Sequence, residues 1–184
     1  MRLSVNLKID WSAKHLDVIP NQREKPRGVR RVISTKNDAR EAIVEITSRA
    51  NRGVAILTRD LEPEIYDHDD FLETLKKFLL QRTFARVRVL ISDPQRAFKV
   101  GNRFVEMGRR LNSYIEFRNI KTENDHAEAF CIVDETGIVY RARADSWDGV
   151  ADTYEPAIAR KYLDKFDALW NASADENYAK PAPH

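Results

Sequence analysis

The run His126-Ala-Glu-Ala-Phe-Cys-Ile-Val-Asp134 places titratable side chains on a stretch with the apolar content of a β-strand. Because successive strand residues point to opposite faces, His126 and Glu128 share one face and Cys131 lies on the other. A histidine at the start of a strand can serve as a nucleophile, or it can pair with a nearby carboxylate such as Glu128 or Asp125. The pairing is the plainer interpretation, and the sequence leaves both open.

Two groups of basic residues are candidates for phosphate contact. Arg141 and Arg143 lie on one face of the next strand, and guanidinium groups bind phosphate oxygens through paired hydrogen bonds. A contribution to a site at His126 requires one of these arginines to lie beside it. The second group follows one flank of a predicted helix and consists of Arg96, Lys99, Arg103 and Arg110. It is either a solvated helix face or a track for a phosphate backbone.

His68 lies among three acidic residues, Asp67, Asp69 and Asp70. Histidine and carboxylates are metal ligands, but acidic residues before an apolar run are also typical of a helix start, where they interact favourably with the helix dipole. We predict a helix start here, and neither a metal nor a cofactor for the chain.

Alternating helices and strands must position these residues. Apolar side chains at helical spacing predict helices over residues 37–53, around 71–79, and over 95–112 and 155–170. The predicted strands cover residues 54–57, 86–93, 114–120, 127–133 and 138–143, with a tight turn at Glu135-Thr-Gly137. Asn37 or Asp38 can cap the first helix, and the last helix is expected to bury Ile158. The fold class is therefore α/β, with a mixed β-sheet flanked by helices on both faces.

The two ends of the chain are simpler. Residues 1–11 alternate polar and apolar side chains, which predicts a strand, and residues 20–31 concentrate five basic side chains in a predicted loop. We assign residues 1–35 to the same domain as residues 36–171. Residues 172–184 are expected to form a flexible tail.

Composition narrows the classes of function. With 31 Lys and Arg against 29 Asp and Glu, the formal net charge is only +2, so no field of the whole protein favours nucleic acid or membrane binding. The single cysteine excludes an intrachain disulfide and fits a reducing compartment. No apolar run approaches the length of a membrane span or a signal peptide, so we expect a cytoplasmic protein.

The order of elements and the residues around the hairpin resemble one half of the phospholipase D superfamily, over residues 36–171. In that family a strand with His-x-Lys leads to an Asp before a turn, then to a strand carrying Gly-Ser and an Asn, then to a helix ending near Leu-Trp. The chain offers His126-Ala-Glu128, Asp134-Glu-Thr-Gly137, Ile138-Val-Tyr-Arg-Ala-Arg-Ala-Asp145 and Ala168-Leu-Trp170 in that order. It is similar, more loosely, to uncharacterised bacterial domains of this type.

The resemblance implies a phospholipase D- and nuclease-like fold and a set of site residues. In active relatives two such motifs meet, one histidine attacks phosphorus, and lysines hold the phosphate oxygens. Carried over, the candidate catalytic residues are His126, Glu128, Asp134 and Asp145, and the candidate phosphate-binding residues are Arg141, Arg143, Arg96, Lys99 and Arg103. Only one motif is present, so a second histidine would have to come from a homodimer.

Departures from the family pattern argue against catalysis. Glu128 stands where the family has lysine, and at ~4 Å with an effective dielectric of ~20 a like charge costs about 4 kcal/mol. Asp134 lies one residue later than in the family, and the Gly-Ser pair is missing. We therefore predict a catalytically degenerate domain that acts as a binding, dimerisation or regulatory module. The alternatives are a metal-independent phosphodiesterase or nuclease active as a homodimer through His126, and a nucleic-acid-binding domain that uses the basic helix face.

Overall fold

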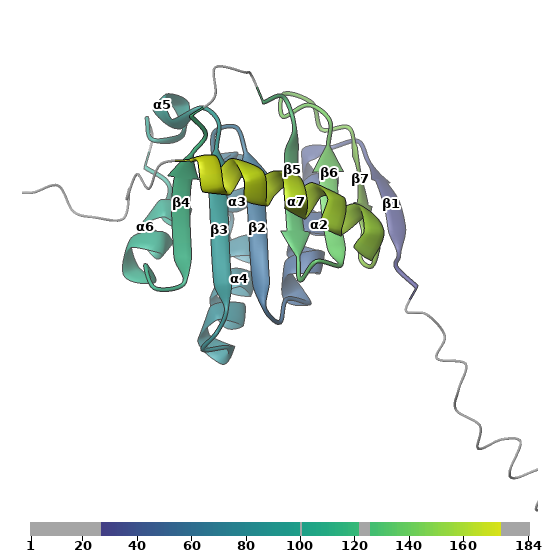
Figure 1. The fold of residues 1–184 in the computed structure, drawn as a ribbon, viewed down its shortest axis with the longest axis horizontal. Coiled ribbons are helices and arrows are strands. Elements are labelled where there is room, and N and C mark those ends of the chain that lie inside the picture. The colour runs from purple at the N-terminus through teal and green to yellow at the C-terminus, as the bar shows by residue number, and fades with distance from the viewer. Residues whose placement is uncertain (1–26, 100, 122–125, 174–184) are drawn as a thin grey trace, which may run out of the picture.

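The computed structural model describes residues 27–99, 101–121 and 126–173, so the strand predicted at residues 1–11 lies outside them. A seven-stranded sheet forms the middle layer, and helices cover both of its faces (Figure 1). The strands are β1 (Arg30–Ile33), β2 (Gly53–Thr58), β3 (Arg86–Ile91), β4 (Ile115–Asn119), β5 (Ala129–Val133), β6 (Gly137–Arg141) and β7 (Gly149–Asp152). The helices are α2 (Lys36–Ser48), α3 (Pro63–Tyr66), α4 (Asp69–Gln81), α5 (Pro94–Ala97), α6 (Arg103–Arg110) and α7 (Pro156–Ala172). The predicted α/β class with a mixed sheet is confirmed.

The strand order in the sheet is β1-β7-β6-β5-β2-β3-β4. The ends of these strands form two opposite borders of the sheet, and we use the word edge for these borders. Strands β2, β3 and β4 are parallel, whereas β5, β6, β7 and β1 each run antiparallel to their neighbours. As a result β2, β3, β4 and β6 end at one edge, where β5 begins; we call it the carboxyl edge. At the opposite edge β2 and β3 begin and the turn between β5 and β6 lies; we call it the hairpin edge.

Two apolar cores lie on the two faces of the sheet. Helices α2, α3, α4 and α6 pack on one face, where the rings of Phe71 and Phe104 meet edge to face at 5.3 Å. On the other face α7 crosses the sheet alone (Figure 1) and packs Phe166 and Trp170 against the strands. Along β5, Phe130 faces α7 and Cys131 faces the opposite core, which confirms the alternation predicted for this strand.

Helix α2 begins earlier than the sequence suggested. Thr35 is its N-cap and accepts a hydrogen bond from the Asp38 amide, while the Asp38 carboxylate accepts from the Thr35 amide. This reciprocal pair is a capping box. Asp38 therefore does contribute to the cap, but from the third helical position, and backbone hydrogen bonds lower its pKa.

The helix predicted over residues 95–112 is two helices, α5 and α6. Asp93 caps α5 by accepting from the Arg96 amide, and Asn102 caps α6 by accepting from the Phe104 amide. A second cap inside the predicted span starts a new helix with its own direction. The expected basic stripe is consequently divided between two elements.

The neighbouring strands β1 and β7, on the outer side of the sheet, differ most from the expectations. The end of the segment predicted as a basic loop, Arg30 and Arg31, begins β1, which pairs with β7, a strand that the sequence pattern did not indicate. Both strands have only four residues, and their partner lies about 120 positions away, so alternation within either is too short to read. Ile158 of α7 was expected to be buried but is 40% exposed. The short helix α3 was also not predicted.

Candidate functional site

His126 lies at the carboxyl edge, just before β5, and lines an open hollow of about 280 Å³. The hollow is bounded by Arg59, which follows β2, and by Arg143 and Asp145, which follow β6. The amide of Ala144 donates to the carbonyl of Ala127 at 2.6 Å, which fixes the segment after β6 against the one before β5. The structure thus brings three of the predicted site residues, His126, Arg143 and Asp145, to one hollow.

Arg143 satisfies the requirement that an arginine lie near His126, but its guanidinium is already engaged. Its Nε and one amino group donate to the two carboxylate oxygens of Asp145 at 2.9 and 2.7 Å. This hydrogen-bonded ion pair lowers the pKa of Asp145. A bidentate carboxylate occupies the same face of the guanidinium that would otherwise hold a phosphate.

Arg141 is buried and lies on the other side of the sheet. Its guanidinium forms an ion pair with Glu62, and the side chains are 3% and 6% exposed. It also donates to the carbonyls of Ala144 and Ser146 and stacks on the ring of Trp147 at 4.9 Å. Arg141 is therefore buried among its protein partners and is not available to a ligand at His126.

The segment that delivers Glu62 has an unusual backbone. Leu61 and Glu62 have φ values of 63° and 25°, in the left-handed region that side chains with a Cβ disfavour. Such conformations cost about 1–3 kcal/mol each and persist where the surrounding structure determines them. Burial raises the pKa of Glu62, although the neighbouring Arg141 acts in the opposite direction. The hydroxyl of Thr58 donates to the second carboxylate oxygen at 3.1 Å.

Glu128, at the position of the family lysine, faces α7. One carboxylate oxygen accepts from Lys165 of α7 at 2.8 Å. The other is buried and, within the described residues, has no hydrogen-bond partner. The site therefore holds an ion pair, internal to the protein, where the family pattern holds a cation facing phosphate.

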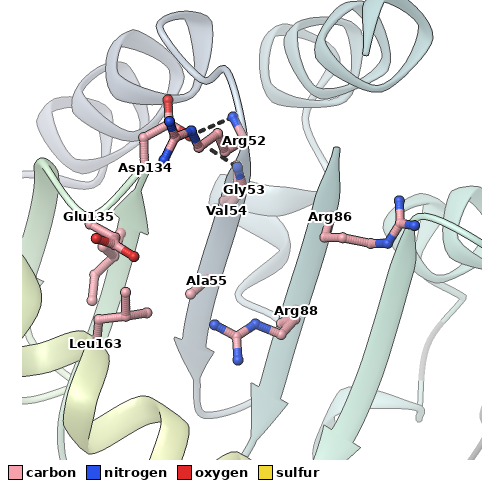
Figure 2. Close-up of a pocket in the computed structure, with 10 residues that line it drawn as sticks. Arg52, Gly53, Val54, Ala55, Arg86, Arg88, Asp134, Glu135 and Leu163 are labelled. Carbon is pink, nitrogen blue, oxygen red and sulfur yellow. Dashed lines mark hydrogen bonds between the residues drawn. The ribbon is translucent and has the colours of Figure 1, made fainter. Parts of the chain in front are cut away.

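Asp134, a predicted catalytic residue, is also separated from His126 by the fold. It lies in the β5–β6 turn at the hairpin edge, where its carboxylate accepts from the amides of Asn51, Arg52 and Gly53 at 2.6, 2.7 and 3.0 Å. Figure 2 shows the bonds from Arg52 and Gly53. Its φ of 52° suits an aspartate in a tight turn. The geometry makes Asp134 a clamp on the start of β2, across the sheet from His126.

Carboxylates pair with two of the four residues of the predicted basic stripe. Arg96 pairs with Asp60 at 2.7 Å, and Arg103 pairs with Asp67 and Asp69 at 2.7 and 2.5 Å. The bond to Arg103 lowers the pKa of Asp69. Lys99 is exposed between the two helices.

The acidic residues around His68 belong to a helix start. His68 is the N-cap of α4, with Asp69 and Asp70 in the first turn. Among the described residues, no three His, Cys, Asp or Glu side chains are grouped so that they could hold a metal ion. Likewise, no helix in the described part of the chain is long and apolar enough to cross a membrane.

Glu62 and Trp147 are the residues at this edge that sequence reasoning missed. A signal for Glu62 existed: alternation from the buried Val139 puts Arg141 on the same buried face, and a buried arginine requires a carboxylate partner. Which carboxylate, 79 positions away, was not readable from the pattern.

Solved structures with a similar fold come from several proteins. The chain aligns with a phospholipase D family member, Nuc from Salmonella typhimurium, at a TM-score of 0.59 and 17% identity, covering 80% of this chain and 97% of that one. NucT from Helicobacter pylori aligns at 0.55 and 11% identity, covering 80% and 99%. TrmBL2, an archaeal chromatin protein whose structure shows a novel mode of DNA binding, aligns at 0.56 and 13% identity, covering 95% of this chain but only 65% of TrmBL2.

No curated protein matches the sequence. The family described as "Domain of unknown function (DUF7931)" matches residues 35–180, which is most of the chain. The seven-stranded mixed sheet and the similarity to Nuc and NucT identify the fold of the chain. It belongs to the DUF7931 family and has the fold of the phospholipase D superfamily.

Proposed function

We propose that this protein is a phospholipase D-like domain that has lost phosphodiester hydrolysis and acts as a binding module. One observation carries the proposal: carboxylates of the same chain pair with both predicted phosphate-binding arginines of the carboxyl edge, although Arg59, which also bounds the hollow, forms no ion pair among the described residues. Arg141 pairs with Glu62 and Arg143 with Asp145. Glu128, in place of the lysine, pairs with Lys165.

The energetic argument follows from what phosphoryl transfer requires. Its transition state gathers negative charge on the phosphate oxygens, so catalysis depends on donors already aimed at that charge. A phosphate bound by either predicted arginine would have to displace Asp145 from Arg143, or Glu62 from a buried pair that the fold holds on the other side of the sheet. A phosphate entering beside Glu128 would instead meet a like charge.

The competing proposal is a homodimer in which two copies of His126 meet at the exposed hollow. It retains the histidine and the similarity to Nuc and NucT, but it must open the Arg143–Asp145 pair. In that case the protein would hydrolyse bis(p-nitrophenyl) phosphate without added metal, and His126→Ala would abolish the reaction.

The decisive experiment compares the full chain with its His126→Ala variant on that substrate, with an active phospholipase D assayed in parallel as a positive control. We expect equal, background rates for both forms. Sedimentation equilibrium on the same samples reports the oligomeric state. Turnover by the wild type that disappears in His126→Ala would overturn the proposal and establish the homodimeric enzyme.

Nucleic acid is a second candidate ligand, favoured by the fold shared with TrmBL2. Because Arg96 and Arg103 are paired with aspartates, we expect weak binding. Fluorescence anisotropy with duplex DNA across a salt series measures it. Tight binding that weakens steeply with salt, and is lost when Arg96, Lys99 and Arg103 become Ala, would show that the basic residues form an interface despite their partners.

A further inference from the structure

A second hollow lies at the hairpin edge, on the face of the sheet that α7 covers (Figure 2). It has a volume of about 200 Å³ and is distinct from the hollow at His126. Its floor is formed by small residues on β2, Gly53 and Ala55, which lie opposite Arg86 and Arg88 on β3. Further along the same face the strands carry bulky residues such as Leu57 and Leu90, so the small side chains create the space.

Arg88 is held in place and directed into this hollow (Figure 2). One amino group donates to Asp167 of α7 at 2.7 Å, and the guanidinium packs on the rings of Phe166 and Trp170 at 5.0 and 5.5 Å. In the part of the chain that the structure describes, this is its only hydrogen bond. A guanidinium carries five N–H donors, so most of its capacity remains open while its orientation is fixed.

Among the described residues Asp167 is the one carboxylate that pairs with an arginine of this hollow, through a single oxygen on Arg88. Both oxygens of Asp134 are occupied by backbone amides, and among the described residues it forms no ion pair with Arg52 or Arg88. Glu135 is 61% exposed, and its ion pair is with Arg160, at 3.9 Å. Arg52, exposed on the rim, adds a second cation.

The rest of the lining is apolar. Ile132 of β5 lies beside Ala55 in the sheet, and Leu163 of α7 also lines the hollow. A site with one oriented guanidinium, a second cation at the rim and a short apolar wall matches a molecule with an anionic head and a small hydrocarbon body. The volume suits a small molecule and is too small for a polymer segment.

We propose that this hollow binds a small organic anion, with its carboxylate or phosphate group on Arg88 and Arg52 and its apolar part on Ala55, Ile132 and Leu163. The site is independent of the carboxyl edge, so the proposal does not rest on the loss of hydrolysis at His126. A molecule bound there would contact β2, β3, the β5–β6 turn and α7 together, and would link the helix to the hairpin edge.

Amide chemical-shift mapping on ¹⁵N-labelled full-length protein tests the proposal. The probes are butyl phosphate, butyrate, inorganic phosphate and butanol, which separate the two anionic heads from each other and from the apolar body. We expect saturable shifts centred on Gly53, Ala55 and Ile132 with butyl phosphate or butyrate, weaker binding of inorganic phosphate, and none with butanol. No saturable shift with either organic anion, or equal shifts with butanol, would overturn the proposal.

Variants identify the groups responsible. Arg88→Gln should weaken binding roughly tenfold or more, because the oriented donors are lost. Arg118→Gln is the matched control: Arg118 lies on the same sheet face and stacks on the same Trp170 at 4.3 Å, but it does not line the hollow. Equal weakening by the two variants would mean that helix packing, not ligand contact, is responsible. Arg52→Gln, at an exposed position, gives a second test that does not depend on the stability of the core.

Discussion

The carboxyl edge and the hairpin edge of the sheet hold the same kinds of side chain, but the arginines of the two edges differ in how fully the protein occupies them. At the carboxyl edge arginines pair with carboxylates, as Arg141 does with Glu62 and Arg143 with Asp145. At the hairpin edge the carboxylate of Asp134 is bound to backbone amides instead. Arg52 and Arg88 face a hollow there, and Arg88 uses one amino group for its ion pair with Asp167. Charge content therefore does not decide where an anion can bind. The decisive property is how many donors of each guanidinium are already taken: Arg141 and Arg143 make several hydrogen bonds to protein, whereas Arg88 makes one within the described residues.

The largest effect is expected from breaking the closed pair at the carboxyl edge. Arg141→Met leaves Glu62 buried and unpaired, which should lower the free energy of unfolding by about 3–5 kcal/mol. Urea denaturation measures this difference. The double variant Glu62→Leu/Arg141→Met should recover most of the loss, since apolar residues can replace a buried ion pair. A loss below about 1 kcal/mol for Arg141→Met would mean that the pair is open to solvent and exchangeable.

At the hairpin edge a smaller loss is expected from Asp134. Asp134→Ala removes the acceptor for three backbone amides and places a Cβ residue without a polar side chain at positive φ, so stability should fall by about 2–3 kcal/mol. Asp134→Asn keeps one acceptor oxygen and tolerates the conformation, and should lose less. Thermal unfolding of both variants gives the ranking. Equal stability of Asp134→Ala and wild type would contradict the clamp and return Asp134 to the list of functional candidates.

The smallest effect concerns the exposed pair beside His126. Because Arg143 lowers the pKa of Asp145 below its usual 3.8, Arg143→Gln should raise that pKa toward the ordinary value. The favourable interaction is present above pH 3.8 and is lost as the pH falls through the lowered pKa in the folded protein. A carboxyl-detected NMR titration of Asp145 reports the shift, while the unfolding free energy at neutral pH should hardly change. An unchanged titration would show that Arg143 is free to meet an anion.

Much of the scaffold was predictable because its signals are local. The alternation around Phe130, the turn after β5 and the spacing of the apolar residues of α4 each depend on neighbours within a few positions. Where a second local signal intervened, the prediction failed: Asn102 starts a new helix inside a stretch that reads as one. The four-residue strands β1 and β7 carry too little pattern and depend on pairing with each other.

The candidate site was predictable only in part. His126, Arg143 and Asp145 meet because β5 and β6 form a hairpin, which the turn residues indicated. Asp134 follows the same strand, but five strand residues carry it to the opposite edge. The resemblance to the phospholipase D pattern identified His126 and Asp134 as candidates, and the length of β5 places them at opposite ends of the strand.

The sequence by itself determined the class of fold, the alternation of β5, and the departure of Glu128 from the superfamily pattern, because each of these depends on residue type and short spacing. Tertiary structure decided which charges meet. Glu62 reaches Arg141 from 79 positions away, and Lys165 reaches Glu128 from 37. An ion pair depends on distance in space and on burial, and neither quantity is encoded in the spacing of two residues along the chain.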